Sequence, residues 1–355
     1  MRRRALLVAV GSTAGGAALA GCLDGEQNGD DDGTDDGSNA PDDPTDDDAA
    51  ADDPADESEA PLIAVADLAG ECPPYPDDHV VCHDAVLAHE RDAAEFELLL
   101  EPGSGTVERG GTIPFELANR SETRFATNFY DWRLHKRVDG EWFHVAPREY
   151  PEPLMSIDPG GTHTWRLTVA ESAVAEGDPV DRSGETGTEA LSVEALGGGR
   201  YAFRARGWFG DGYDDGTYAF GATFDVDAPA LSIEPTNAVV ETRREGDTLL
   251  AESNRVDPED GRLGTYELRR VGDAGSAELP GGVELTRLIA EQVLRDDQLR
   301  DAVALAVEHD AETVRIEEYT GITPVFGADS DGYYEIDGTV YEVTTEPIEE
   351  ARIEL

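Results

Sequence analysis

The central part of this chain, residues 93 to 226, is built from short stretches in which apolar and polar residues alternate. Such alternation is typical of half-buried β-strands, because successive side chains of a strand point to opposite faces. Glycine or proline separates most of the stretches, as expected of turns. The predicted strands are Phe96–Leu100, Thr112–Leu117, Phe125–Arg137, Glu141–Val145, Thr162–Val169, Tyr201–Trp208 and Tyr218–Val226. Seven short strands predict a two-sheet sandwich, which we assign to residues 93–229.

Four sequence motifs follow one another within this region. They are Phe115–Ser121 (FELANRS), Leu134–Trp142 (LHKRVDGEW), Ile157–Thr162 (IDPGGT) and Gly199–Arg204 (GRYAFR). Their order resembles that of the immunoglobulin-like domains of bacterial and archaeal lipoproteins and surface proteins. The resemblance implies the fold and says little about function. It also suggests that Asn119 bonds backbone at a strand end and that Tyr201 forms a tyrosine corner.

The acidic stretch from Ala170 to Leu196 departs from this pattern, because it is longer than a simple strand connection. We expect it to form a surface flap or a recognition loop, two alternatives that the sequence leaves open.

Asp139-Gly140 predicts a two-residue hairpin turn. In this register Leu134 faces Val145 and Arg137 faces Trp142, while His135 faces His144. Two facing histidines suggest a metal site, but the sequence supplies no third ligand. We therefore favour an exposed cross-strand pair.

After residue 229 the strand pattern gives way to a mixture of helical and strand patterns. Residues 230–355 therefore predict a small α+β domain. The pattern from Glu284 to His309 is helical, with a break or cap at Asp296-Asp297. Strands are expected at Thr265–Val271, Thr313–Glu317, Tyr333–Ile336 and Thr339–Val343, the last two joined at Asp337-Gly338. This order predicts an antiparallel sheet with helices on one face. It also resembles small domains of haloarchaeal proteins that have no assigned activity.

The first 22 residues predict an export signal that ends in a lipid-attachment cysteine. Three arginines precede an apolar run that is too short to span a membrane comfortably, and small residues lead to Cys22. The arginine pair and the mild apolar core resemble a twin-arginine (Tat) signal. Lipid on Cys22 would anchor the protein to the outer face of the cell membrane.

The chain carries a formal net charge of −51, and Lys136 is its one lysine. Residues 23–60 contain 17 acidic and no basic side chains, with almost no apolar ones, which predicts a disordered acidic stalk. Such a charge argues against binding to nucleic acid. The composition resembles that of proteins from extremely halophilic archaea, where molar salt screens repulsion.

Residues 61–92 form a cysteine-containing segment with Cys72 and Cys82. Outside the cytoplasm, two cysteines at this spacing most simply form a disulfide. The alternatives are a metal site in which His79, His83 and His89 assist the thiolates, and free thiols. The spacing matches no zinc motif, so we expect neither a bound metal nor another cofactor.

No nucleophile elbow, phosphate-binding loop, dinucleotide fingerprint or zinc-protease motif is present in the sequence. The chain is therefore predicted to be a non-enzymatic, lipid-anchored surface protein that interacts with an unknown surface protein or ligand. Alternatives are an extracytoplasmic solute- or metal-binding lipoprotein and a protease inhibitor. Candidate binding residues are Trp208, Phe209 and Tyr213, although the first two could instead close the sandwich core.

Overall fold

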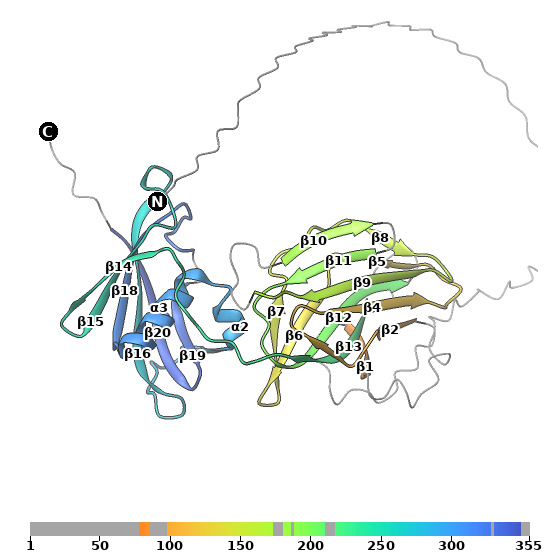
Figure 1. The fold of residues 1–355 in the computed structure, drawn as a ribbon, viewed down its shortest axis with the longest axis horizontal. Coiled ribbons are helices and arrows are strands. Elements are labelled where there is room, and N and C mark those ends of the chain that lie inside the picture. Colours follow the sequence, from red (N-terminus) through yellow and green to blue (C-terminus); the bar gives the residue numbers. More distant parts are fainter. Residues whose placement is uncertain are drawn as a thin grey trace, which may run out of the picture. The chain divides into compact units, whose positions relative to one another are not determined.

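Three β-sheets make up most of the part of the chain that the structure describes (Figure 1). The structure is a computed structural model and describes residues 78–84, 98–172, 180–185, 188–209, 217–327 and 330–348. All three sheets belong to one compact unit, which spans Ser58–Leu355.

The first sheet is built around two long antiparallel strands, β12 (Gly199–Phe209) and β13 (Thr217–Asp227). It has eight strands in the described residues, with the path β1-β13-β12-β5-β8 and side branches through β3, β6 and β7. The other strands are β1 (Asp78–Asp84), β3 (Thr106–Glu108), β5 (Phe125–Thr127), β6 (Arg133–Val138), β7 (Glu141–Ala146) and β8 (Met155–Ile157).

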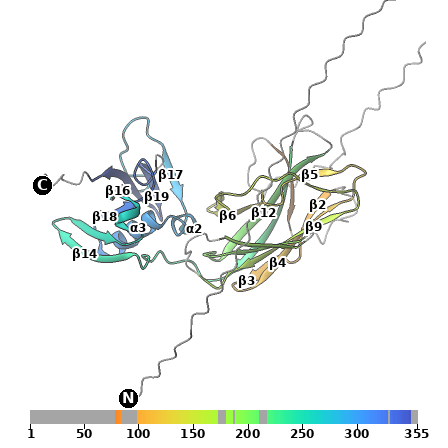
Figure 2. The same ribbon diagram turned by 90° about the horizontal axis from the view of Figure 1, so that it is seen from above.

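The second sheet has the strand order β10-β11-β9-β4-β2. Its strands are β2 (Leu98–Pro102), β4 (Thr112–Asn119), β9 (Thr162–Val169), β10 (Val180–Glu185) and β11 (Thr188–Val193). Seen from above, β6 and β12 lie in one layer and β4 and β9 in the other (Figure 2). The inner residues of both layers form one aromatic core, in which the Phe115 ring of β4 stacks on the Phe203 ring of β12 at 4.4 Å.

The third sheet follows the sandwich and has seven strands in the order β14-β15-β18-β16-β20-β19-β17. Its strands are β14 (Val239–Glu245), β15 (Thr248–Ser253), β16 (Arg262–Asp273), β17 (Leu285–Leu288), β18 (Thr313–Thr320), β19 (Gly332–Ile336) and β20 (Thr339–Pro347). Two helices, α2 (Ala290–Val293) and α3 (Asp297–His309), lie between β17 and β18, and a 3₁₀ turn covers Pro258–Asp260.

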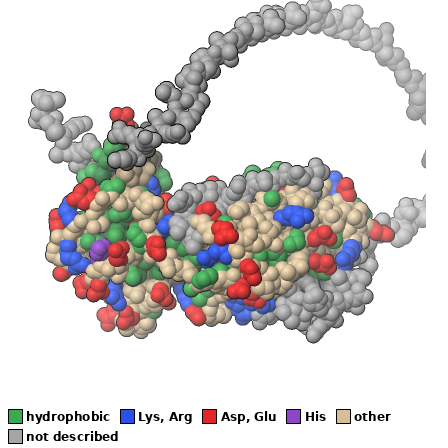
Figure 3. All heavy atoms as spheres, in the orientation of Figure 1, with side chains coloured by type: hydrophobic (Ala, Val, Ile, Leu, Met, Phe, Trp, Pro, Cys, Tyr) green, Lys and Arg blue, Asp and Glu red, His purple; other side chains and the backbone are tan. Residues whose placement is uncertain are grey.

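Helix α3 packs its apolar residues onto one face of this third sheet. Leu299 and Val303 share a buried cluster with Leu268 and Ile316 of the sheet. The helix begins where the sequence predicts, because the Asp296 carboxylate accepts a hydrogen bond from the Leu299 amide at 3.0 Å. The opposite sheet face carries cross-strand ion pairs, and Figure 3 shows acidic and basic side chains interspersed over the visible surface.

The predicted fold class is confirmed: the protein is mainly β, with a sandwich followed by an α+β region. Strand β9 has the predicted bounds, and the hairpin at Asp337-Gly338 pairs Tyr334 with Tyr341 as expected. Asn119 donates to the carbonyls of Thr123 and Ile157, both at 2.9 Å, which confirms its predicted role at a strand end. The predicted acidic stalk and the export signal lie outside the described residues.

Several local predictions are wrong. The stretch Phe125–Arg137 is two strands rather than one, because the Asn128 side chain accepts the Tyr130 amide and turns the chain between them. Residues 285–288, predicted to be helical, form β17, which pairs in parallel with β19. The third sheet is also mixed rather than antiparallel, since β15 pairs in parallel with β18.

The stretch from Ala170 to Leu196 is not only a loop. It contributes β10 and β11, and β11 pairs in parallel with β9 and buries Leu191 and Val193 in the core. The hairpin at Asp139-Gly140 has the predicted pairs except one, because an irregularity shifts Leu134 opposite Ala146 instead of Val145.

Candidate functional site

A short stretch around α2 joins the third sheet to the sandwich through one buried carboxylate. Glu291 is only 2% exposed. Its Oε1 atom accepts hydrogen bonds from Lys136 Nζ at 2.5 Å and from the Gly197 amide and the Tyr201 hydroxyl, both at 3.1 Å. Lys136, the chain's one lysine, therefore helps to join the third sheet to the sandwich. We call these contacts around α2 the junction.

Tyr201 adds the tyrosine-corner geometry that the motif implies. Its hydroxyl lies 2.8 Å from the Gly197 carbonyl four residues upstream, so its single proton is shared between this carbonyl and Glu291 Oε1. Burial and the neighbouring Glu291 carboxylate raise the pKa of Tyr201 well above its usual value, so the hydroxyl stays protonated and can donate.

Arg295 makes the second set of contacts at the junction. It donates to the carbonyls of Glu194 at 2.5 Å, Ala195 at 3.2 Å and Glu291 at 2.6 Å. Burial lowers the pKa of Arg295 to about 10, which leaves the guanidinium charged at neutral pH. Gln292 donates to the His144 carbonyl at 3.1 Å and so holds the end of β7 against α2.

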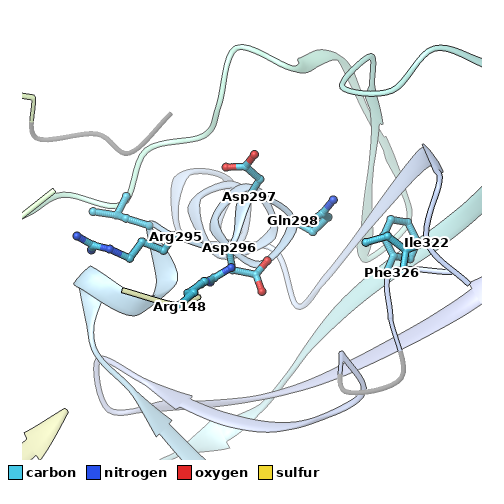
Figure 4. Close-up of a pocket in the computed structure, with 8 residues that line it drawn as sticks. Arg148, Arg295, Asp296, Asp297, Gln298, Ile322 and Phe326 are labelled. Carbon is cyan, nitrogen blue, oxygen red and sulfur yellow. The ribbon is translucent and has the colours of Figure 1, made fainter. Parts of the chain in front are cut away.

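Beside this junction lies a pocket of about 350 Å³ (Figure 4). It curves around the first turn of α3 and includes one residue of the β7–β8 connection, Arg148. The pocket is lined by Arg148, Leu294, Arg295, Asp296, Asp297, Gln298, Ile322 and Phe326.

Charges of both signs line this pocket. Arg148 is exposed and forms no hydrogen bond or ion pair with any residue that the structure describes. Asp296 uses Oδ1 to cap α3, and Asp297 lies 3.4 Å from Arg255 Nε. Arg148 makes no ion pair with either aspartate, although all three line the same space.

The pocket also has an apolar part. Leu294 is fully buried at its base and Phe326 is nearly buried, whereas Ile322 is 58% exposed. In Figure 4 Ile322 and Phe326 lie together on one side of the first turn of α3, and Arg295 lies on the other. The arrangement can hold a small molecule that has separate charged and apolar parts.

The facing histidines of the β6–β7 hairpin have no third metal-ligating side chain beside them among the described residues. His135 and His144 are paired as predicted, with ring centroids 5.3 Å apart, but they are half-buried rather than exposed. Burial is the largest cause that lowers the pKa of His135 to about 3 and that of His144 to about 4, and the arginines Arg133 and Arg204 lower both further. A positive environment of this kind also disfavours a bound cation.

Within the described ranges, no cluster of three or more histidine, cysteine, aspartate or glutamate side chains could hold a metal ion. His163 is a third histidine with a lowered pKa, about 4, which burial causes. Its ring stacks on Phe129 at a centroid distance of 3.5 Å, and neither ring nitrogen has a hydrogen-bond partner.

Two further groups of buried charges stabilise the fold. In the sandwich, the Asp131 carboxylate lies 3.5, 3.4 and 3.2 Å from nitrogen atoms of Arg133, Arg204 and Arg206, respectively. We call this the Asp131 cluster.

In the α+β region, Arg255 of the connection after β15 pairs with Asp301 of α3 at 2.5 Å, with Asp297 of α3 at 3.4 Å and with Glu318 of β18. Thr236 donates to both oxygens of Asp301, and Gln298 donates to Glu318 at 2.8 Å. We call this the Arg255 cluster.

The structure separates the sequence-predicted site residues. Cys22, Cys72, His89 and Tyr213 lie outside the described residues. His79, Cys82 and His83 lie on β1, at register positions opposite Tyr218, Gly221 and Ala222 of β13. The disulfide and the metal site therefore stay predictions.

Of the two predicted binding residues that are described, Trp208 is half-buried and Phe209 is only 6% exposed. The Phe209 ring packs against Phe125 at 5.2 Å and Tyr218 at 5.4 Å, so it belongs to the sandwich core. The alternative interpretation of Phe209, as a residue that closes the core, is correct.

The sequence patterns did not reveal the pocket, the junction or either cluster. Acidic residues are so frequent in this chain that Glu291 and Asp131 do not stand out, and Asp296 stands out only as a helix cap. The scarce basic residues are the better signal: Lys136 and Arg255 each bind a buried carboxylate.

No model of a known protein family matches the chain, and no curated protein matches it in sequence. In the residues that could be searched, the helices are all too short or too polar to cross a membrane.

Proposed function

We propose that this protein is a non-enzymatic, lipid-anchored surface protein of a halophilic archaeon, with a structural or protein-interaction role. The observation that carries the proposal is how the described part uses its buried charges. Glu291, Asp131 and Arg255 each make several ion pairs or hydrogen bonds inside the fold instead of facing a cleft. Such groups hold layers of the structure together, whereas a catalytic acid or base must reach its substrate.

The sequence supports the cellular location. Three arginines, the apolar run and the small residues before Cys22 favour export and lipid attachment. The acidic residues 23–60 would separate the sandwich from the membrane surface, because mutual repulsion extends such a chain. The sandwich is joined to the third sheet by the junction, and the two together then present a rigid surface to a partner.

Replacement of the predicted lipid-attachment residue tests the anchor. We expect Cys22→Ser to move the protein from the membrane fraction into the medium of a halophilic host, because no lipid can attach to serine. Cys72→Ser is the matched control and should remain in the membrane fraction. Retention of Cys22→Ser in the membrane fraction would contradict the proposal.

A further inference from the structure

We propose that the pocket beside the first turn of α3 binds a small zwitterion of the amino-acid class with an apolar side chain. The ligand's carboxylate would lie against Arg148, its ammonium group against Asp296, and its side chain against Ile322 and Phe326. This inference goes beyond the proposed surface role and does not depend on the lipid anchor.

The unpaired charges of the pocket carry the inference. Arg148 has no partner among the described residues, and Asp296 has one engaged oxygen, the Oδ1 that caps α3. A cation and an anion that served only to stabilise the fold would gain by pairing with each other, yet these two do not pair. Two groups of opposite sign, both left available in one pocket, match a ligand that carries both signs.

The surrounding charges disfavour a ligand of one sign. A free anion would meet Asp296 and Asp297 in the pocket. A simple cation would meet Arg148 and the buried Arg295. Each end of a zwitterion finds an opposite charge, and these contacts act at short range, where salt screens little.

The helix terminus is not itself the anion site. The Asp296 carboxylate already occupies the N-cap position of α3 and accepts the Leu299 amide. The positive end of the helix is therefore neutralised within the chain, which leaves Arg148 as the group that can receive a carboxylate.

Size and shape favour a small ligand. A volume of about 350 Å³ lies at the lower end of small-molecule sites, which span roughly 300–1,000 Å³. Leu294 and Phe326 supply buried apolar surface, and Ile322 exposes most of its side chain beside them. Covering Ile322 with an apolar side chain removes that surface from water.

The junction keeps the two sides of the pocket in place. Arg295 binds three backbone carbonyls, and Gln292 binds the His144 carbonyl at the end of β7, four residues before Arg148. A pocket held by hydrogen bonds on both sides loses little freedom when a ligand enters.

Isothermal titration of the full mature chain in molar salt tests the inference with L-leucine and L-phenylalanine as probes. We expect at least one of them to bind. We expect N-acetyl-L-leucine, which lacks the cation, and L-leucinamide, which lacks the anion, to bind about tenfold more weakly than L-leucine. Failure of both amino acids to bind at about 10 mM, or equal binding of the blocked analogues, would overturn the inference.

Two variants assign the charged ends. Arg148→Gln should weaken L-leucine binding about tenfold and abolish the preference for L-leucine over L-leucinamide. Asp296→Asn should abolish the preference over N-acetyl-L-leucine, while asparagine still caps α3. Arg166→Gln changes an exposed arginine of β9 that does not line the pocket; this variant is the control and should bind normally. Unchanged binding by Arg148→Gln would overturn the inference.

Discussion

The Asp131 cluster and the Arg255 cluster have opposite compositions. In the sandwich one carboxylate contacts three arginines, and in the α+β region one arginine contacts three carboxylates. The outer members differ in their access to water. Each cluster has one outer member near the surface, because the side chains of Arg206 and Asp297 are 41% and 39% exposed. The other outer members differ: the side chains of Asp301 and Glu318 are fully buried, whereas those of Arg133 and Arg204 keep 22% and 8% exposure.

The two clusters show how a chain with so many carboxylates can bury some of them. A buried carboxylate is costly unless donors surround it, because water no longer solvates the charge. Asp301 and Glu318 depend on Arg255, with help from Thr236 and Gln298. Arginines have long apolar stems and can keep their charged ends near water, so the Asp131 cluster depends less on its central residue.

The largest expected effect is the loss of Arg255. Arg255→Met should lower the free energy of unfolding by about 3–5 kcal/mol, because it leaves Asp301 and Glu318 buried without their shared cation. Urea unfolding in molar salt at pH 7 measures the change.

The control for Arg255 comes from the open face of the same sheet. Arg269 pairs with Glu342 but is half exposed, so Arg269→Met should cost at most about 1 kcal/mol. A cost for Arg255→Met no greater than that for Arg269→Met would show that burial of the carboxylates is unimportant.

Unlike the members of the two clusters, His163 is a buried titratable group without a hydrogen-bond partner among the described residues. Its folded-state pKa of about 4 lies below the usual histidine pKa of about 6.5, so the unfolded chain takes up the proton first. The contribution of His163 to the free energy of unfolding is therefore fully present above pH 6.5. It falls by about 3 kcal/mol as the pH drops from 6.5 to 4.

His163→Phe should remove that part of the acid sensitivity, because phenylalanine can keep the stacking on Phe129 and takes up no proton. Urea unfolding at pH 7 and pH 4 should show a smaller difference for the variant than for the wild type. His135 and His144 act in the same pH window, so some acid sensitivity should remain. An unchanged difference would mean that His163 does not couple folding to pH.

The fold was predictable where the local pattern and the long-range pairing agree. Strand β9 alternates over its full length, and Asp139-Gly140 and Asp337-Gly338 form turns that need a positive φ at both residues. The start of α3 was predictable because Asp296 is a good N-cap residue.

The prediction failed where pairing with a strand distant in sequence determines the secondary structure. Leu285 and Leu288 have helical spacing, yet pairing with β19 makes this segment β17. Strand β14 was missed because six of its seven residues are exposed, so no apolar alternation marks it. The bulge beside Leu134 changes a register that the turn alone would fix.

The pocket and the clusters could not be predicted for a related reason. Arg148 and Asp296 are far apart in sequence, and neither belongs to a motif. Their meeting depends on the contacts of Glu291 and Arg295 with the sandwich. Single-sequence patterns describe neighbours along the chain, whereas these contacts arise from packing between layers.

The smallest of the three effects is expected for Asp131. Asp131→Asn removes the charge and keeps an acceptor, and it should cost about 2 kcal/mol in urea unfolding at pH 7 in molar salt. Arg204 is the one nearly buried partner, whereas Arg133 retains the Pro147 carbonyl and the Tyr150 ring. A loss as large as that of Arg255→Met would contradict the comparison, since it would mean that the arginines depend on Asp131 as strictly as the buried carboxylates depend on Arg255.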